Sequence, residues 1–181
     1  TNRPAYYAYH KNGITFLVLD TQDDLSSITG EQKLLFDSVV DTISSASSHL
    51  IVLHHKLIWM YNHPELETRI PFITNVAMVD SSCFYCINPN NFYEDVYPKL
   101  VEVKSRGIEV FCIGGDIGKK AKSFAYKTEE DIFLLASGLG NADTLNSALV
   151  FQHNVTERTL LWHFESLRSL HEERLELLEI D

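Results

Sequence analysis

The feature that most constrains the fold is a series of short, largely apolar runs, each followed by polar residues or glycine. The first of these runs lie at residues 14–20, 50–53 and 108–113. Short runs rich in β-branched and aromatic residues are typical of strands buried on both faces of a sheet. Segments 29–43 and 92–106 separate the runs and repeat their apolar residues at helical spacing. Because strands alternate with helices, we expect an α/β fold.

The second half of the chain departs from this alternation. Residues 132–137, 148–153 and 159–165 have strand-like patterns, and no helical pattern separates them. Residues 6–9 form a further predicted strand, which would make a hairpin with residues 14–20. Strands that follow one another directly pair most simply in antiparallel fashion, so we expect mixed strand directions.

We therefore predict the α/β class, with a layered mixed β-sheet sandwich flanked by helices. Residues 1–181 are expected to form a single domain. Residues 56–91 show no sustained period, and an irregular insertion or a lid is expected there. Residues 166–181 repeat leucines on one broad side and are predicted to form a C-terminal helix.

Local signals define the two longer helices. Thr29 and Gln32 have the spacing of a capping box, in which each side chain bonds a backbone amide of the first turn. Pro98 fits the second helix only if that helix begins near Tyr97 or is kinked there. Gly107 is well placed to end it.

Composition and charge exclude several classes of partner. The chain has 181 residues and a formal net charge of -10. An acidic surface repels phosphate backbones, so we expect no nucleic-acid partner. No apolar run approaches the roughly 18 residues of a membrane span, so no membrane partner is expected either. The N-terminus lacks a starting Met and the pattern of a signal peptide, and we expect a processed or truncated product of unknown localisation.

The cysteines leave several alternatives open. Cys83 and Cys86 form a C-x-x-C pair, and Cys112 lies in an apolar run. One such pair without a second is weak evidence for zinc, and no strand-to-helix context favours a thioredoxin-like role. We expect ordinary loop thiols, with a disulfide and metal ligation as the alternatives.

Candidate functional residues follow the predicted strands. Ligand sites in open α/β sheets lie outside the carboxyl ends of the strands, so these positions are favoured for binding and catalysis. The candidates are His54 and His55 after residues 50–53, Gly115 and Asp116 after residues 108–113, and Asn141 after residues 132–137.

The chemistry of these side chains suits a metal or phosphate site. Neutral imidazole is a ligand of zinc, iron and manganese. A carboxylate such as Asp116 can bind a hard cation or orient a histidine ligand. Glycine lets the backbone approach a ligand closely. Each feature also has a structural interpretation, as a hydrogen-bonded core histidine or as a tight turn.

The order of several motifs resembles that of a known family. A tyrosine-rich strand at residues 6–9 precedes an apolar strand that ends in Leu19-Asp20-Thr21. A helix that opens with Thr29-Gly-Glu-Gln32 follows, and then a strand that ends in His54-His55. This series, over roughly residues 5–165, resembles the calcineurin-like metallophosphoesterases.

The resemblance implies a function and a set of roles. Members of this family fold as two packed β-sheets flanked by helices and hydrolyse phosphate esters with two divalent metal ions, which activate a water for attack on phosphorus. By resemblance, His54 is a metal ligand, and His55 and Asp116 are catalytic or face the substrate. Gly115 and Asn141 are expected to contact the phosphate-ester substrate. The metals would be Mn, Fe or Zn, two in a complete site.

The chain departs from the family pattern in two places. The family's Asp-x-His, Gly-Asp-x-x-Asp and Gly-Asn-His motifs belong upstream of Tyr6. The later Gly-His-x-His motif falls where the chain has Gly115 and Ile117 in place of histidines. We therefore expect this chain to be the C-terminal portion of a metallophosphoesterase-like domain and to contribute part of the site. The segment alone would be inactive, would bind few or no metal ions, and would expose a strand edge that favours self-association.

Two functions follow as hypotheses. The first is a metal-dependent phosphoester hydrolase, a phosphatase or phosphodiesterase, as the full-length protein. The alternative is a degenerate, non-catalytic family member that acts as a binding or assembly module, which the missing histidines at Gly115 and Ile117 favour.

Overall fold

A six-stranded sheet organises the molecule. The computed structural model describes residues 5–22, 26–76, 79, 83, 85–140 and 145–171. The strand order is β1-β2-β3-β4-β6-β5. Strands β2, β3, β4 and β6 run parallel, and the edge strands β1 and β5 run antiparallel to their neighbours. The bounds are β1 (Tyr7–Lys11), β2 (Ile14–Val18), β3 (His49–His54), β4 (Glu109–Gly114), β5 (Ser123–Lys127) and β6 (Phe133–Ser137).

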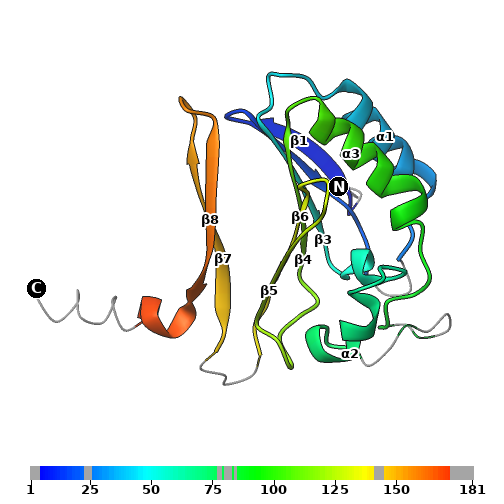
Figure 1. Ribbon diagram of the computed structural model, residues 1–181, viewed down its shortest axis with the longest axis vertical. Coiled ribbons are helices and arrows are strands. Elements are labelled where there is room, and N and C mark those ends of the chain that lie inside the picture. Colours follow the sequence, from blue (N-terminus) through cyan, green and yellow to red (C-terminus); the bar gives the residue numbers. More distant parts are fainter. Residues whose placement is uncertain are drawn as a thin grey trace, which may run out of the picture.

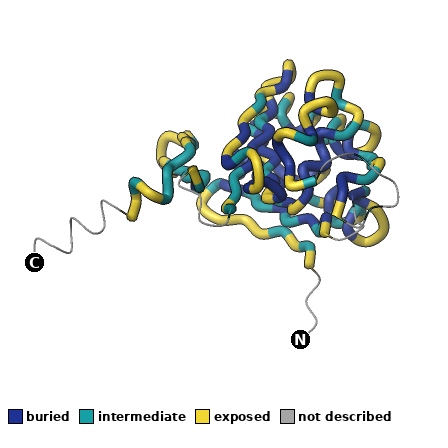
Figure 2. Tube along the Cα trace, turned by 90° about the horizontal axis from the view of Figure 1, so that it is seen from below, coloured by how far each residue is buried: buried dark blue, intermediate teal, exposed yellow. Residues whose placement is uncertain are grey.

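Different layers cover the two faces of this sheet. Helices α1 (Gly30–Thr42) and α3 (Tyr97–Ser105) lie on one face, and the antiparallel pair β7 (Ser147–Asn154) and β8 (Thr159–Ser166) lies on the other (Figure 1). Buried residues concentrate in the body of the molecule, and exposed residues lie on its outer loops and toward both ends of the described chain (Figure 2). The α/β class and the mixed strand directions predicted from the sequence are confirmed.

Alternation along β3 explains why both faces are covered. Leu50 and Val52 pack in the core beneath the helices, whereas Ile51 packs with Phe111 in a second cluster. Aromatic residues of the small sheet meet that second cluster, and the rings of Phe111 and Phe151 are 5.8 Å apart in an edge-on contact. Successive side chains of a strand point to opposite faces, so a strand that is covered on both faces needs apolar residues at successive positions.

The start of α1 differs from the predicted capping box. Thr29 is the N-cap residue, but its side chain makes no capping hydrogen bond. Gln32 is buried and instead bonds the backbone of Asp20: its Oε1 accepts from the Asp20 amide and its Nε2 donates to the Asp20 carbonyl. The capping-box prediction is wrong, because the Gln32 side chain hydrogen-bonds the backbone just after β2 and not the backbone at the start of α1.

The segment after β3 packs into the core. It contains the short 3₁₀ turns η1 (Ile58–Met60) and η2 (Glu67–Arg69) and the single-turn helix α2 (Ile70–Ile73). Its buried members include Trp59, whose ring stacks on Phe124 at 5.4 Å. The segment ends in a π-helical turn, η3 (Phe92–Val96), that continues into α3. Pro98 lies in the first turn of α3, where a missing amide hydrogen costs nothing, as predicted for a helix beginning at Tyr97.

Two further differences concern strand β5 and the cysteines. Strand β5 was not expected from the sequence, because its residues Ser123–Lys127 form an edge strand with polar neighbours. Cys83 and Cys86 form a disulfide, so the prediction of free loop thiols is wrong, and Cys112 is buried and free. Of the predicted C-terminal helix, residues 167–171 are helical, and residues 172–181 lie outside the described residues. Within the described ranges, no helix has the length and apolar character to cross a bilayer.

Gly138 provides a test of the packing at the carboxyl edge of the sheet. A methyl group at this position would collide with the carbonyl oxygen of Ile117. We expect Gly138→Ala to lower the free energy of unfolding by about 1–3 kcal/mol, because backbone must move to make room. Urea denaturation measures the change. Gly115→Ala is the matched control, since the nearest atom to its methyl would be His55 Nδ1 at 3.9 Å. Equal losses in the two variants would contradict this packing.

Candidate active site

The carboxyl ends of β3 and β4 bring two of the predicted residues together. His54 pairs in register with Gly114. Beyond the strands, the carbonyl oxygen of His55 accepts hydrogen bonds from the amides of Gly115 and Asp116, each at 2.9 Å. The turn after β4 is therefore held directly against the His54-His55 pair.

Thr21 connects the end of the neighbouring strand β2 to the same point. It is buried, and its Oγ1 accepts hydrogen bonds from the amides of His55 at 3.0 Å and Lys56 at 2.9 Å. One hydroxyl thus provides the hydrogen-bond acceptor for the two backbone amides that directly follow β3. The ends of β2, β3 and β4 form one hydrogen-bonded cluster.

His54 has an unusual environment. Its Nδ1 lies 2.6 Å from the carbonyl oxygen of Lys56, and its ring packs near Gly114 and Leu57. A carbonyl oxygen only accepts, so Nδ1 carries the proton and Nε2 carries the lone pair. Burial lowers the pKa of His54 to about 4, although the bond to Lys56 acts in the opposite direction. The imidazole is therefore neutral near pH 7.

The second nitrogen of His54 has no partner among the described residues. Its Nε2 is buried and makes no hydrogen bond to any of the residues that the structure describes. An unpaired buried acceptor costs roughly 1–3 kcal/mol. A neutral imidazole whose N–H is fixed by a backbone carbonyl, with a bare Nε2, is the arrangement commonly found in metal-ligating histidines.

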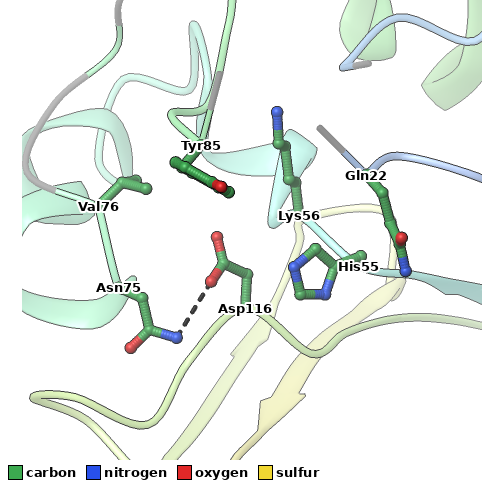
Figure 3. Close-up of a pocket in the computed structure, with 7 residues that line it drawn as sticks. All are labelled: Gln22, His55, Lys56, Asn75, Val76, Tyr85 and Asp116. Atoms are coloured by element: carbon green, nitrogen blue, oxygen red, sulfur yellow. Dashed lines mark hydrogen bonds between the residues drawn. The ribbon is translucent and has the colours of Figure 1, made fainter. Parts of the chain in front are cut away.

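A pocket of about 390 Å³ opens beside this cluster. Asp116 lies at its centre, with the His55 ring on one side and Tyr85 above (Figure 3). Asn75 fixes the carboxylate, because its Nδ2 donates to Asp116 Oδ1 at 3.0 Å and its own Oδ1 accepts from the Lys119 amide at 2.7 Å. The lining residues are Gln22, His55, Lys56, Asn75, Val76, Tyr85 and Asp116.

The predicted site residues have different positions relative to this pocket. His55 and Asp116 line it together. His54 is buried next to them and does not line it. Gly115 does not line the pocket either, although its amide donates to the His55 carbonyl. Asn141 lies outside the described residues.

Five further lining residues were not identified from the sequence, among them Lys56, Asn75 and Tyr85. Lys56 directly follows the two histidines, and this adjacency was an available signal. Asn75 and Tyr85 belong to the segment without periodicity, so no pattern indicated their role. Tyr85 lies within the loop closed by the Cys83–Cys86 disulfide, which restricts where its ring can lie over the pocket.

A complete metal site needs more donors than this cluster provides. Among the residues that the structure describes, no three His, Cys, Asp or Glu side chains are close enough to hold a metal ion. Catalytic zinc sites have three protein ligands. The donor types at hand, a bare imidazole nitrogen and a carboxylate, nevertheless suit a divalent ion.

The pKa of His54 predicts how stability changes with pH. Between the folded value of about 4 and the ordinary value of 6.5, the unfolded chain binds a proton that the folded chain excludes. Stability is therefore lost as the pH falls through this window, by about 2 kcal/mol on reaching roughly pH 4.5. Urea denaturation at about pH 7 and at roughly pH 4.5, in the presence of a chelator, measures this loss.

Two variants isolate the contribution of His54 from that of other groups. His54→Gln should reduce the pH-dependent loss by about 2 kcal/mol. Leu161→Gln should keep the wild-type pH dependence, because Leu161 does not titrate and is 67% exposed on β8. The same pH dependence in His54→Gln and in the wild type would contradict a buried neutral imidazole.

Comparisons with known proteins give no family for this chain. No protein-family model matches it, and no curated protein matches it. Function is therefore inferred from the geometry of the His54, His55 and Asp116 cluster.

Proposed function

We propose that the chain contributes part of the active site of a metal-dependent phosphoester hydrolase. The observation that carries this proposal is the bare, buried Nε2 of His54, at the carboxyl edge of parallel strands and next to a pocket with His55 and Asp116. Sites in open α/β sheets occur at this edge. The layered arrangement of a mixed sheet with helices on one face and a second sheet on the other also supports a metallophosphoesterase-like fold.

His54 would hold a divalent ion through Nε2. The bond from Nδ1 to the Lys56 carbonyl at 2.6 Å fixes the tautomer and the ring orientation that ligation requires. Manganese, iron and zinc all accept such a ligand. Bound at this edge, a divalent ion would supply Lewis acidity for charge that develops on the phosphoryl oxygens.

The pocket residues would handle the substrate and its protons. Lys56 lines the pocket and would be positioned to contact a phosphate ester there. The carboxylate of Asp116, held by Asn75, would accept a proton from the attacking water. In its protonated form, His55 would give a proton to the leaving oxygen as the bond to phosphorus breaks, and would become a neutral imidazole.

The proposal requires donors beyond those described. His54 and Asp116 cannot by themselves fix two divalent ions, so the remaining ligands would come from outside the described residues. The proposal therefore applies to the full-length gene product that contains this chain.

Turnover of aryl phosphate esters with Mn²⁺ tests the proposal. We expect the full-length product to hydrolyse 4-nitrophenyl phosphate or its bis-ester. His54→Gln should lower turnover by about 100-fold and reduce the bound metal, because a ligand has been lost. Mass spectrometry of the purified protein measures the metal content.

His153→Gln is the matched control. His153 also has a buried Nε2 without a partner among the described residues, but its ring lies against His49 on the side of the sheet that faces β7 and β8. This variant should keep wild-type turnover and metal content. A full-length product without bound metal or activity would favour the alternative, a non-catalytic binding module, and unchanged turnover in His54→Gln would remove His54 from the site.

A further inference from the structure

A second pocket, distinct from the one at His55, is walled by aromatic rings. It has a volume of about 270 Å³ and lies where the segment after η1, the start of α3 and strand β5 meet. It shares no lining residue with the pocket at Asp116. The lining residues are His63, Pro64, Glu65, Tyr93, Tyr97, Tyr126, Thr128, Glu129 and Glu130. We call it the tyrosine pocket.

The rings stand at angles to one another and do not form a flat stack. Tyr93 and Tyr97 have ring centroids 5.2 Å apart and planes inclined by 55°. The His63 ring is 5.7 Å from Tyr93 at 56°, and 5.2 Å from Tyr126 at 85°. Rings that are inclined to one another cannot all turn their edges to the cavity they line, and a ring face carries the negative charge density that attracts a cation.

Hydrogen bonds to carboxylates fix two of these tyrosines. The hydroxyl of Tyr97 donates to Glu130 at 2.5 Å, and that of Tyr126 donates to Glu65 at 3.2 Å. The hydroxyl of the third, Tyr93, donates to the backbone carbonyl of Trp59 at 2.8 Å. The rings are therefore held in place before any ligand binds, which lowers the entropic cost of binding.

The charge of the tyrosine pocket is negative. Glu65, Glu129 and Glu130 contribute carboxylates, and the described lining residues include no lysine or arginine. Lys127, the nearest basic residue in sequence to Tyr126, pairs with Asp131 at 2.5 Å. Burial lowers the pKa of His63, so its ring is neutral near pH 7 and does not repel a cation.

We infer that the tyrosine pocket binds a small quaternary ammonium ion. Aromatic walls with nearby carboxylates select a bulky, weakly hydrated organic cation, because methyl groups contact the rings while the charge meets their π faces. A hard cation such as Ca²⁺ would instead need six to eight oxygen ligands, and rings supply none. This inference rests on the tyrosine pocket alone and stands or falls separately from the proposed hydrolase.

Choline and its neutral isostere 3,3-dimethylbutan-1-ol form the decisive pair of probes. The two molecules have the same shape, but the isostere has carbon in place of the charged nitrogen of choline. The difference between their affinities therefore reports the contribution of the charge. We expect choline to bind the full chain at least about tenfold more tightly than the isostere, as calorimetry or NMR titration would measure. Equal affinity, or binding of neither probe, would overturn the inference. This comparison uses only the wild-type chain and so does not depend on how any variant folds.

Variants separate the rings from the carboxylates. Tyr126 is partly buried on the edge strand β5, and Tyr126→Leu should weaken choline binding by about tenfold and leave the isostere unaffected. Tyr7→Leu is the matched control, since Tyr7 lies 52% exposed on the opposite edge strand β1. If Tyr126→Leu left choline binding unchanged while Ca²⁺ competed with choline, the site would be a carboxylate cluster, and the inference would be wrong.

Discussion

The hydrogen bond from His54 Nδ1 to the Lys56 carbonyl is the interaction on which the account of the site depends. At 2.6 Å it fixes the proton on Nδ1, and burial keeps the ring neutral. The lone pair is then confined to Nε2, where no described residue uses it. A fold that leaves an acceptor buried and unpaired bears a free-energy cost, and a bound water, a bound ion or a catalytic role is the usual explanation for such a group.

The sheet explains why this imidazole lies beside a pocket. Parallel strands β2, β3 and β4 end at the same edge, and Thr21 ties the first two of these ends together through the amides that follow His54. Gly114 leaves room for Leu57 and the His54 ring, since a methyl there would collide with Leu57. The same edge receives Asp116, oriented by Asn75. Backbone pairing, and not side-chain attraction alone, therefore sets the geometry of the cluster.

Much of the central sheet could be predicted from local sequence, because a strand buried on both faces must be apolar throughout. Residues 50–53 are the clearest case, and the structure extends that strand to His49–His54. The edge strand β5 escaped prediction because one side of it meets solvent and its polar residues conceal the alternation. Gln32 was assigned to a helix cap, since local spacing cannot reveal a partner such as Asp20 that the fold brings near.

In the candidate site, too, some features could be predicted from the sequence and others could not. The adjacency of His55 and Asp116 followed from the rule that parallel strands share a carboxyl edge, and the structure brings the two residues together in one pocket. The contributions of Asn75 and Tyr85 depend on the path of an aperiodic segment and on the Cys83–Cys86 disulfide, and neither leaves a periodic signal in the sequence.

The tautomer of His54 is the most direct test of the central claim. Long-range ¹H–¹⁵N correlation spectra of histidine-labelled chain near pH 7, assigned by comparison with His54→Gln, distinguish a protonated ring nitrogen from a bare one. The account predicts that Nδ1 of His54 carries the proton and that Nε2 is bare, and that zinc added to the full-length product shifts the Nε2 resonance. A proton on Nε2, or on both nitrogens, would contradict it.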